Sequence, residues 1–213
     1  MQDHQQPTPS TLATLRGLCP NRGLTTDEAL RIAQRQAQAL LEAAQVTDGP
    51  VPLAVFARLP RITIAVDPSL PTSGMSYWDG ETWRLVAHAD EHPHRQRFSL
   101  AHEYKHVIDH SRCDLLYADH RIREAAADYF AACLLMPKQA LTRAWCAGVQ
   151  DLDELSEHFQ VSTPALQRRL RDLGLSDRYQ SRRYRCDRPS SRTLTGRSPL
   201  AIAGRRTTTG VRT

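Results

Sequence analysis

The segment 121–136 constrains the fold more than any other part of the sequence. It reads RIREAAADYFAACLLM, and Pro137 directly after it ends a helix. A helix that is apolar on nearly all sides needs burial, so the segment predicts a central helix with other elements packed around it. Two carboxylates, Glu124 and Asp128, interrupt this apolar surface four residues apart and therefore share one face of the helix. Because a buried carboxylate is costly unless it is paired or binds a metal, this face predicts a binding site.

A second predicted helix, over about 97–110, contains the sequence HEYKH and so matches the pattern H-E-x-x-H. With about 100° of rotation per residue, His102, Glu103 and His106 share one face, and the apolar residues of the helix lie on the opposite face. Two imidazoles one turn apart can bind the same zinc ion, and the adjacent carboxylate can contact a water molecule on that ion. Lys105 lies beside this face, where we expect it to flank the approach of a substrate or to reach solvent.

A catalytic zinc ion requires a third protein ligand. Arg112 stands where an H-E-x-x-H-x-x-G-x-x-H pattern would have its last histidine, which excludes that kind of site. Glu124 is the better candidate, and Asp128, one turn away, would then accept a hydrogen bond from a ligand imidazole. The alternative is an acidic stripe on the protein surface. A donor for the oxyanion is also needed, and the residues of a suitable type are Tyr77, His88, Tyr117 and His120.

Further elements are predicted on both sides of these two helices. Thr25 and Glu28 form a capping box, which begins a helix that runs to about residue 46. An alternating β-branched run at 62–66 predicts a strand, and Asp79-Gly80 is typical of a hairpin. These strands predict a small antiparallel sheet between helices. Shorter helices are predicted at about 138–147, 151–159 and 164–173.

The charge of the chain is unevenly distributed. Its 213 residues carry a formal net charge of +5, but the segment 176–213, with ten Arg and two Asp, carries +8, so residues 1–175 carry −3. The basic character is therefore weak evidence that the folded part binds nucleic acid. No apolar run is long enough to cross a membrane, and the first residues show no secretory signal. The five Cys show no C-x-x-C spacing, which favours a cytoplasmic protein with reduced thiols over a disulfide framework.

The segments RFSLAHEYKHVIDH (97–110) and EAAADYFAACLLMP (124–137) resemble the ImmA/IrrE family of metallo-endopeptidases. These are zincins of the thermolysin-like group, with H-E-x-x-H and a downstream E-x-x-x-D/N. The resemblance implies a Zn2+ cofactor. The site residues that it implies are His102, His106 and Glu124 as zinc ligands and Glu103 as the general base. Asp128 matches the last position of the downstream motif, whereas Lys105 stands where the family usually has Gly.

The same resemblance implies an α+β fold: a mostly helical zincin-like peptidase domain with a small antiparallel sheet, followed by a helix-turn-helix-like pair. We expect a flexible leader at 1–24, the zinc peptidase domain at 25–150, the helical extension at 151–175 and a disordered Arg-rich tail at 176–213. Proteins of this kind cut a partner transcriptional repressor of the XRE helix-turn-helix type. The resemblance therefore implies a chain that hydrolyses peptide bonds in such a repressor.

Two features leave other functions open. The segment 151–175 has the length of a helix-turn-helix, with Arg168 and Arg169 on its second helix, but its net charge is −2 and Gln160 occupies the turn position where Gly is common. It could contact DNA, pack against the preceding domain or dock a substrate, and the Arg-rich tail could bind nucleic acid weakly. The alternatives to a peptidase are thus a DNA-binding regulator or a toxin–antitoxin-like partner with a non-catalytic zinc site. The intact Glu103 counts against both, because a structural zinc site does not need a general base.

Overall fold

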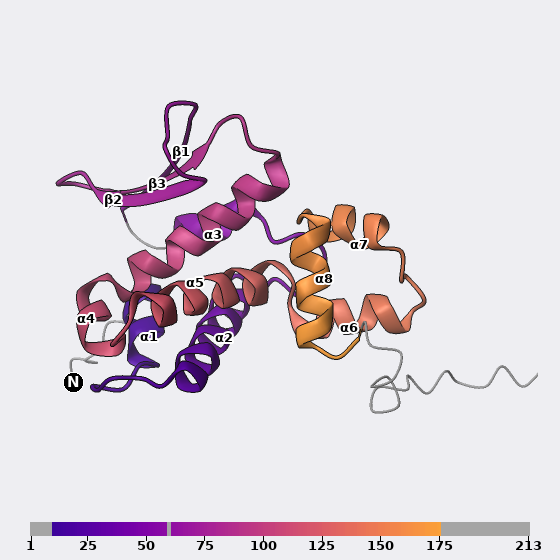
Figure 1. Cartoon of the computed structure of the whole chain (residues 1–213), viewed down its shortest axis with the longest axis horizontal. Coiled ribbons are helices and arrows are strands. Elements are labelled where there is room, and N and C mark those ends of the chain that lie inside the picture. Colours follow the sequence, from indigo (N-terminus) through magenta and orange to yellow (C-terminus); the bar gives the residue numbers. More distant parts are fainter. Residues whose placement is uncertain (1–9, 59–60, 176–213) are drawn as a thin grey trace, which may run out of the picture.

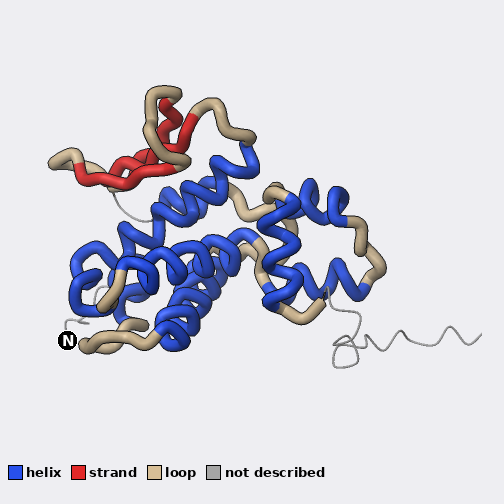
Figure 2. Tube along the Cα trace, in the orientation of Figure 1, coloured by secondary structure: helices blue, strands red, loops and turns tan. Residues whose placement is uncertain are grey.

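The computed structural model describes residues 10–58 and 61–175, which form helices and one small sheet (Figures 1 and 2). The expected α+β class, mostly helical, is confirmed. In chain order the elements are α1 (Thr11–Gly17), α2 (Thr26–Ala43), the 3-10 helix η1 (Leu53–Arg58), β1 (Ile62–Asp67), β2 (Gly74–Trp78), β3 (Trp83–His88), α3 (Pro93–Asp109), the 3-10 helix η2 (His110–Arg112), α4 (Cys113–Leu116), α5 (His120–Leu135), α6 (Lys138–Cys146), α7 (Leu152–Phe159) and α8 (Thr163–Asp172).

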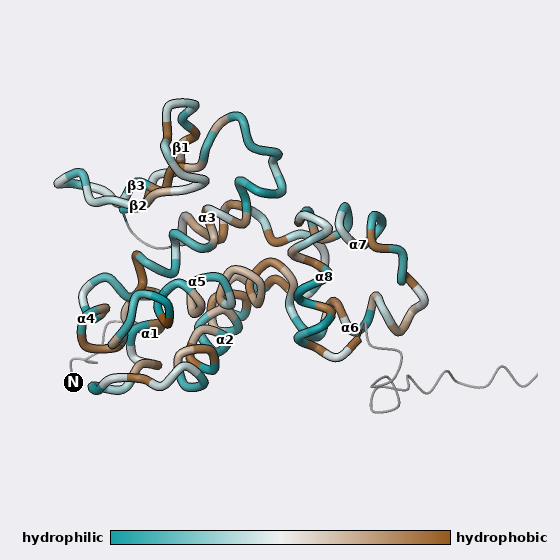
Figure 3. Tube along the Cα trace, in the orientation of Figure 1, coloured by the Kyte–Doolittle hydropathy of each residue, from teal (hydrophilic) through white to brown (hydrophobic). Residues whose placement is uncertain are grey.

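Helix α5 lies in the middle of the helical part, as its apolar sequence predicted. It packs against α2 and against α3, and Figure 3 shows hydrophobic stretches in brown along α5 and α2, where the two helices run side by side. Its buried residues include Ala126, Phe130 and Leu134. The sheet covers α3, so the layers follow the order sheet, α3, α5 and α2 (Figure 1). Although α5 is apolar, no helix among the described residues has both the length and the hydrophobicity to cross a membrane.

The sheet has the strand order β1-β3-β2. The predicted hairpin at Asp79-Gly80 is confirmed, because β2 and β3 are antiparallel neighbours. The expectation of a purely antiparallel sheet is wrong, because β1 pairs in parallel with β3, with Ile62 opposite Trp83. Three consecutive residues of β3, Leu85 to Ala87, are buried, whereas β1 is largely exposed. The more buried strand, β3, takes the central position, and β1 pairs with the edge of β3 that β2 leaves free.

Part of the segment expected to be a flexible leader is helical. Ser10 accepts a hydrogen bond from the N–H of Ala13 and so caps α1, and Leu15 is buried in the main core. Arg16 donates to the backbone carbonyls of Ile108 and Val107, at 2.7 and 3.1 Å. The expectation of a flexible leader is therefore wrong for residues 10–24. The sequence did not reveal this, because contacts with a distant helix such as α3 leave no local pattern. Residues 1–9 and the expected tail, 176–213, lie outside the described residues.

Helices α7 and α8 form the predicted helix pair. Gln160 ends α7 in the left-handed conformation, with a φ of 51°, at the position where Gly is common. Leu155 and Leu170 of the pair belong to the same buried cluster as the core residues of α2 and α5. Arg169, expected as a DNA contact if the pair binds DNA, is only 2% exposed and donates to the backbone carbonyl of Met136 at 3.3 Å. The pair thus packs onto the rest of the molecule through the side that carries Arg169.

Candidate functional site

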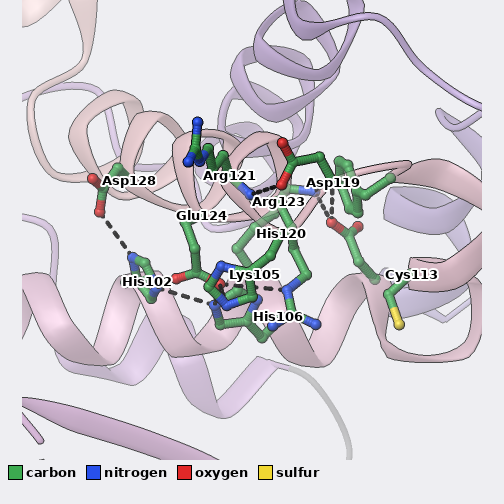
Figure 4. Close-up of polar contacts among 12 residues, drawn as sticks. His102, Lys105, His106, Cys113, Asp119, His120, Arg121, Arg123, Glu124 and Asp128 are labelled. Carbon is green, nitrogen blue, oxygen red and sulfur yellow. Dashed lines mark hydrogen bonds and ion pairs between the residues drawn. The ribbon is translucent and has the colours of Figure 1, made fainter.

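Helices α3 and α5 bring the predicted metal ligands together. His102 and His106 lie one turn apart on α3, and Figure 4 shows both pointing toward Glu124 on α5. The two Nε2 atoms are 3.0 Å apart, and the Glu124 carboxylate oxygens lie 3.2 Å from Nε2 of His102 and 3.6 Å from Nε2 of His106. One donor atom from each of the three residues falls within a span of 4.8 Å. Two imidazole nitrogens and one carboxylate oxygen form a donor set that suits zinc.

Asp128 orients His102 from the side opposite Glu124 (Figure 4). Its Oδ1 lies 3.0 Å from Nδ1 of His102, so a proton on Nδ1 leaves the lone pair of Nε2 free for a metal. Burial lowers the pKa of His102, but the hydrogen bond to Asp128 and the nearby carboxylates outweigh burial and raise this pKa above 6.5. The same hydrogen bond is the main reason why the pKa of Asp128 is lowered.

His106 is held in its neutral form. Burial, followed by the neighbouring His102, lowers the pKa of His106 to about 4. At neutral pH this imidazole therefore carries no charge and keeps a lone pair for a metal. Together with the convergence of two imidazoles and one carboxylate, this makes the residues present suitable for a divalent cation such as zinc.

Glu103 is positioned by strand β2, a contact that the sequence analysis missed. The hydroxyl of Ser76 donates a hydrogen bond of 2.7 Å to Oε2 of Glu103. Gly74 makes the close approach of β2 and α3 possible, because a Cβ atom there would lie 3.0 Å from Cβ of Ser99 and 3.3 Å from Cγ of Glu103. Gly74 and Ser76 share a face of β2, because they are two positions apart and the side chains of a strand alternate between its faces. This alternation could have identified Ser76 once the hairpin was placed over α3.

Lys105 lies elsewhere than expected. It neither flanks the site nor reaches solvent, because it is 1% exposed. Its ammonium group donates to Asp109 and, at 3.1 Å, to the hydroxyl of Tyr117, which itself donates to Asp109 at 2.6 Å. The segment after α3 folds back over this side of the helix, and it covers Lys105. Tyr117 is therefore engaged in this buried cluster and not available as an oxyanion donor.

The remaining oxyanion candidates differ in their distance from the ligands. Nε2 of His120 lies 3.3 Å from Oε1 of Glu124, with a side chain that is 69% exposed. Tyr77 is exposed on β2 and alternates with Ser76, so it points away from α3. His88, at the end of β3, accepts a hydrogen bond from the N–H of Asp90. Of the four candidates, His120 is the one that contacts the proposed ligands.

A cleft of about 720 Å³ is lined by four of the site residues, His102, Glu103, Glu124 and Asp128. Its walls come from the segment before β2, from α3 and from α5, and its far wall is α8. The residues of α8 and its N-terminus that line the cleft are Ser162, Pro164, Ala165, Arg168, Arg169 and Asp172. The helix pair thus contributes directly to the space in front of His102 and Glu103, which favours packing and substrate docking over DNA contact.

One family model and one solved structure are similar to parts of this chain. The family model Peptidase_M78, described as the IrrE N-terminal-like domain, matches residues 62–171, from the start of β1 into α8. Among solved structures, a Mycobacterium tuberculosis transcriptional regulator is similar, with a TM-score of 0.49 and 19% sequence identity. The similarity covers 76% of this chain and 52% of the regulator, so this chain matches about half of that protein's length. None of the curated proteins that were compared matches this chain.

Proposed function

The chain belongs to the Peptidase_M78 family of the IrrE N-terminal-like domain, and on this basis we propose that it is a zinc-dependent metallo-endopeptidase. One observation carries the proposal: His102, His106 and Glu124 converge within 4.8 Å. A fourth residue, Glu103, lines the same cleft and is held by the hydroxyl of Ser76. A purely structural metal site would have no use for this additional, oriented carboxylate.

In the proposed enzyme, His102, His106 and Glu124 hold the zinc ion, and Asp128 fixes the tautomer of His102. When bound, zinc supplies Lewis acidity, which polarises the scissile carbonyl group and lowers the pKa of water. The pKa of His106, lowered to about 4, supports its role because the neutral imidazole is available across the physiological range.

Glu103 acts as the general base and then as the general acid. Its carboxylate accepts a proton from the attacking water and later donates that proton to the nitrogen of the leaving amine. Ser76 restricts the rotamer of Glu103 through their 2.7 Å hydrogen bond, so the carboxylate faces the cleft in one orientation. His120, next to Glu124, is the proposed donor to the oxygen that gains negative charge.

The proposed substrate is a transcriptional repressor of the XRE helix-turn-helix type. The support is the family resemblance of the motif-bearing segments, 97–110 and 124–137, since such peptidases act on a partner repressor. Because such a repressor is a cytoplasmic protein, the proposed location of the enzyme is also the cytoplasm. Weak contact of the Arg-rich segment 176–213 with nucleic acid stays a prediction.

The test begins with zinc content, measured by elemental analysis after purification with zinc supplied. We expect about one zinc ion per chain, lost in Glu124→Ala and retained in the control Glu154→Ala, which changes an exposed residue of α7. Glu103→Gln should retain zinc and lose cleavage of a peptide library by about 10²-fold or more. A wild-type chain that binds no zinc, or a Glu103→Gln variant with unchanged cleavage, would contradict the proposal.

A further inference from the structure

We propose that the α8 side of the cleft is a specificity subsite that binds an acidic side chain, Asp or Glu, of the substrate peptide. Arg169 and Arg168 would bind the carboxylate, two or three residues from the bond that is cut. This inference rests on the proposed peptidase function, to which it adds the chemical class of the substrate.

Arg169 is the main observation. Its side chain lines the cleft although it is only 2% exposed, and its Nε donates to the carbonyl of Met136 at 3.3 Å. The guanidinium lies over the ring of Tyr129, 5.5 Å from the ring centroid. Its Nη1, however, is buried without a hydrogen-bond partner, and no ion pair among the described residues includes Arg169. A buried cation with an unused donor is costly. Because Nη1 itself is closed off from solvent, the guanidinium must rotate toward the cleft before a substrate carboxylate can accept from it.

Arg168 adds a second guanidinium on the accessible side. Its side chain is 67% exposed, and Nη1 lies 3.8 Å from Oδ2 of Asp128. This long contact leaves most of the N–H donors of Arg168 free. The other oxygen of Asp128 lies 3.0 Å from His102. A guanidinium fork matches the two oxygens of a carboxylate, which a single ammonium group does not.

The other residues of this part of the cleft leave space for a side chain. Ala132 and Ala165 line it with small side chains. Asp128 and Asp172 contribute two negative charges, which balance the two positive charges of Arg168 and Arg169. The backbone N–H groups at the start of α8 add a partial positive charge. Ser162 is the N-cap residue of α8, but its side chain makes no hydrogen bond to these groups.

The position of the subsite follows from helix geometry. Tyr129, which the Arg169 guanidinium covers, lies five residues after Glu124 on α5, or about 7–8 Å along the helix axis. An extended peptide advances about 3.3 Å per residue. A substrate peptide that runs parallel to α5, with its scissile bond beside Glu124, would therefore reach Arg169 with the side chain two or three residues away from that bond.

The first arm of the test measures binding without cleavage. A zinc-loaded full-length chain with Glu103→Gln is immobilised and used to select peptides from a random library. We expect Asp or Glu to be enriched at one position of the selected peptides. The enrichment should disappear when Arg168→Gln or Arg169→Gln is added and remain with Arg171→Gln, the exposed control on the same helix. A selection that yields no acidic position, or the same result with every variant, overturns the subsite.

The second arm measures cleavage by the chain with Glu103 intact. Paired peptides that differ only by Glu or Gln at the selected position should differ about tenfold or more in kcat/KM. Arg168→Gln should abolish this ratio, whereas the control Arg171→Gln should leave the ratio unchanged. Equal cleavage of both peptides overturns the inference. If no peptide is cut, the peptidase proposal fails, and the binding arm alone decides the subsite; if Arg169→Gln does not fold, Arg168→Gln decides it.

Discussion

Position 105 shows how one residue of the motif can serve stability and not chemistry. Lys105 and Asp109 form an ion pair within α3, and Tyr117, from the segment that follows α4, closes over both. Burial and the neighbouring Asp109 raise the pKa of Tyr117, so its hydroxyl stays protonated and continues to donate to the carboxylate. The cluster therefore fastens the end of α3, one turn beyond the HExxH residues, to the chain that leads into α5.

Removing one partner of this pair should destabilise the protein strongly. Lys105→Met leaves the Asp109 carboxylate buried without its cation, which we expect to lower the free energy of unfolding by about 3–5 kcal/mol. The double variant Lys105→Met/Asp109→Leu removes both charges and should recover most of that loss. Urea unfolding followed by circular dichroism measures both. If the double variant lost as much stability as Lys105→Met and Asp109→Leu lose together when each is measured alone, the two residues would not be coupled.

At the scale of single residues, the sequence was sufficient for those side chains that share a helix face. Helical periodicity alone grouped His102, Glu103 and His106, and the same rule paired Glu124 with Asp128. It could not reveal Ser76 or Arg169, because their roles depend on which elements come to lie opposite each other in the fold.

At the scale of elements, the contact between β2 and α3 requires a residue without a side chain. We expect Gly74→Ala to push β2 away from Ser99 and Glu103 and to cost about 1–3 kcal/mol of stability. Cleavage activity should fall further than stability explains, since the displaced strand also carries Ser76. Thermal unfolding and kcat report the two effects. Gly17→Ala is the control, because a Cβ there meets no atom within 4 Å; equal losses in both variants would refute the close-approach explanation.

The N-terminus of α2 should make stability sensitive to acid. Glu28 accepts hydrogen bonds from Arg22 and from the N–H of Thr25, and its pKa is lowered from 4.5 to about 2, chiefly by Arg22. Because the folded pKa is the lower one, this stabilisation is complete above pH 4.5 and is lost as the pH falls toward 2. The Tm of wild type should therefore exceed that of Glu28→Gln at pH 6, and the difference should shrink between pH 4.5 and 2. A difference that does not change with pH would exclude this linkage.

Most elements could be predicted because their signals are local. The capping box at Thr25, the hairpin at Asp79-Gly80 and the proline after α5 each act within a few residues. The parallel pairing of β1 and the helix α1 could not, because both depend on partners far along the chain, β3 in one case and the end of α3 in the other.

At the scale of the whole molecule, one buried cluster extends from Leu15 in α1 to Leu175 after α8. A shared core predicts that the helix pair and the rest of the described chain unfold together. Far-UV circular dichroism reports the helices, and fluorescence reports Trp78 and Trp83 in the sheet and Trp145 in α6. We expect the two signals to give the same urea midpoint. Two separated transitions would show that the described chain does not unfold as one unit.

The pairing of α2 with α5 has a consequence for synthesis on the ribosome. The centres of the two helices are about 90 residues apart along the chain, yet α2 finds its main partner in α5. At about 5–20 residues per second, α2 leaves the ribosome about 5–20 s before α5 does. Its apolar face, with Ile32, Leu40 and Leu41, stays uncovered during that interval. The nascent chain therefore presents α2 as a segment for chaperones to bind until the central helix arrives.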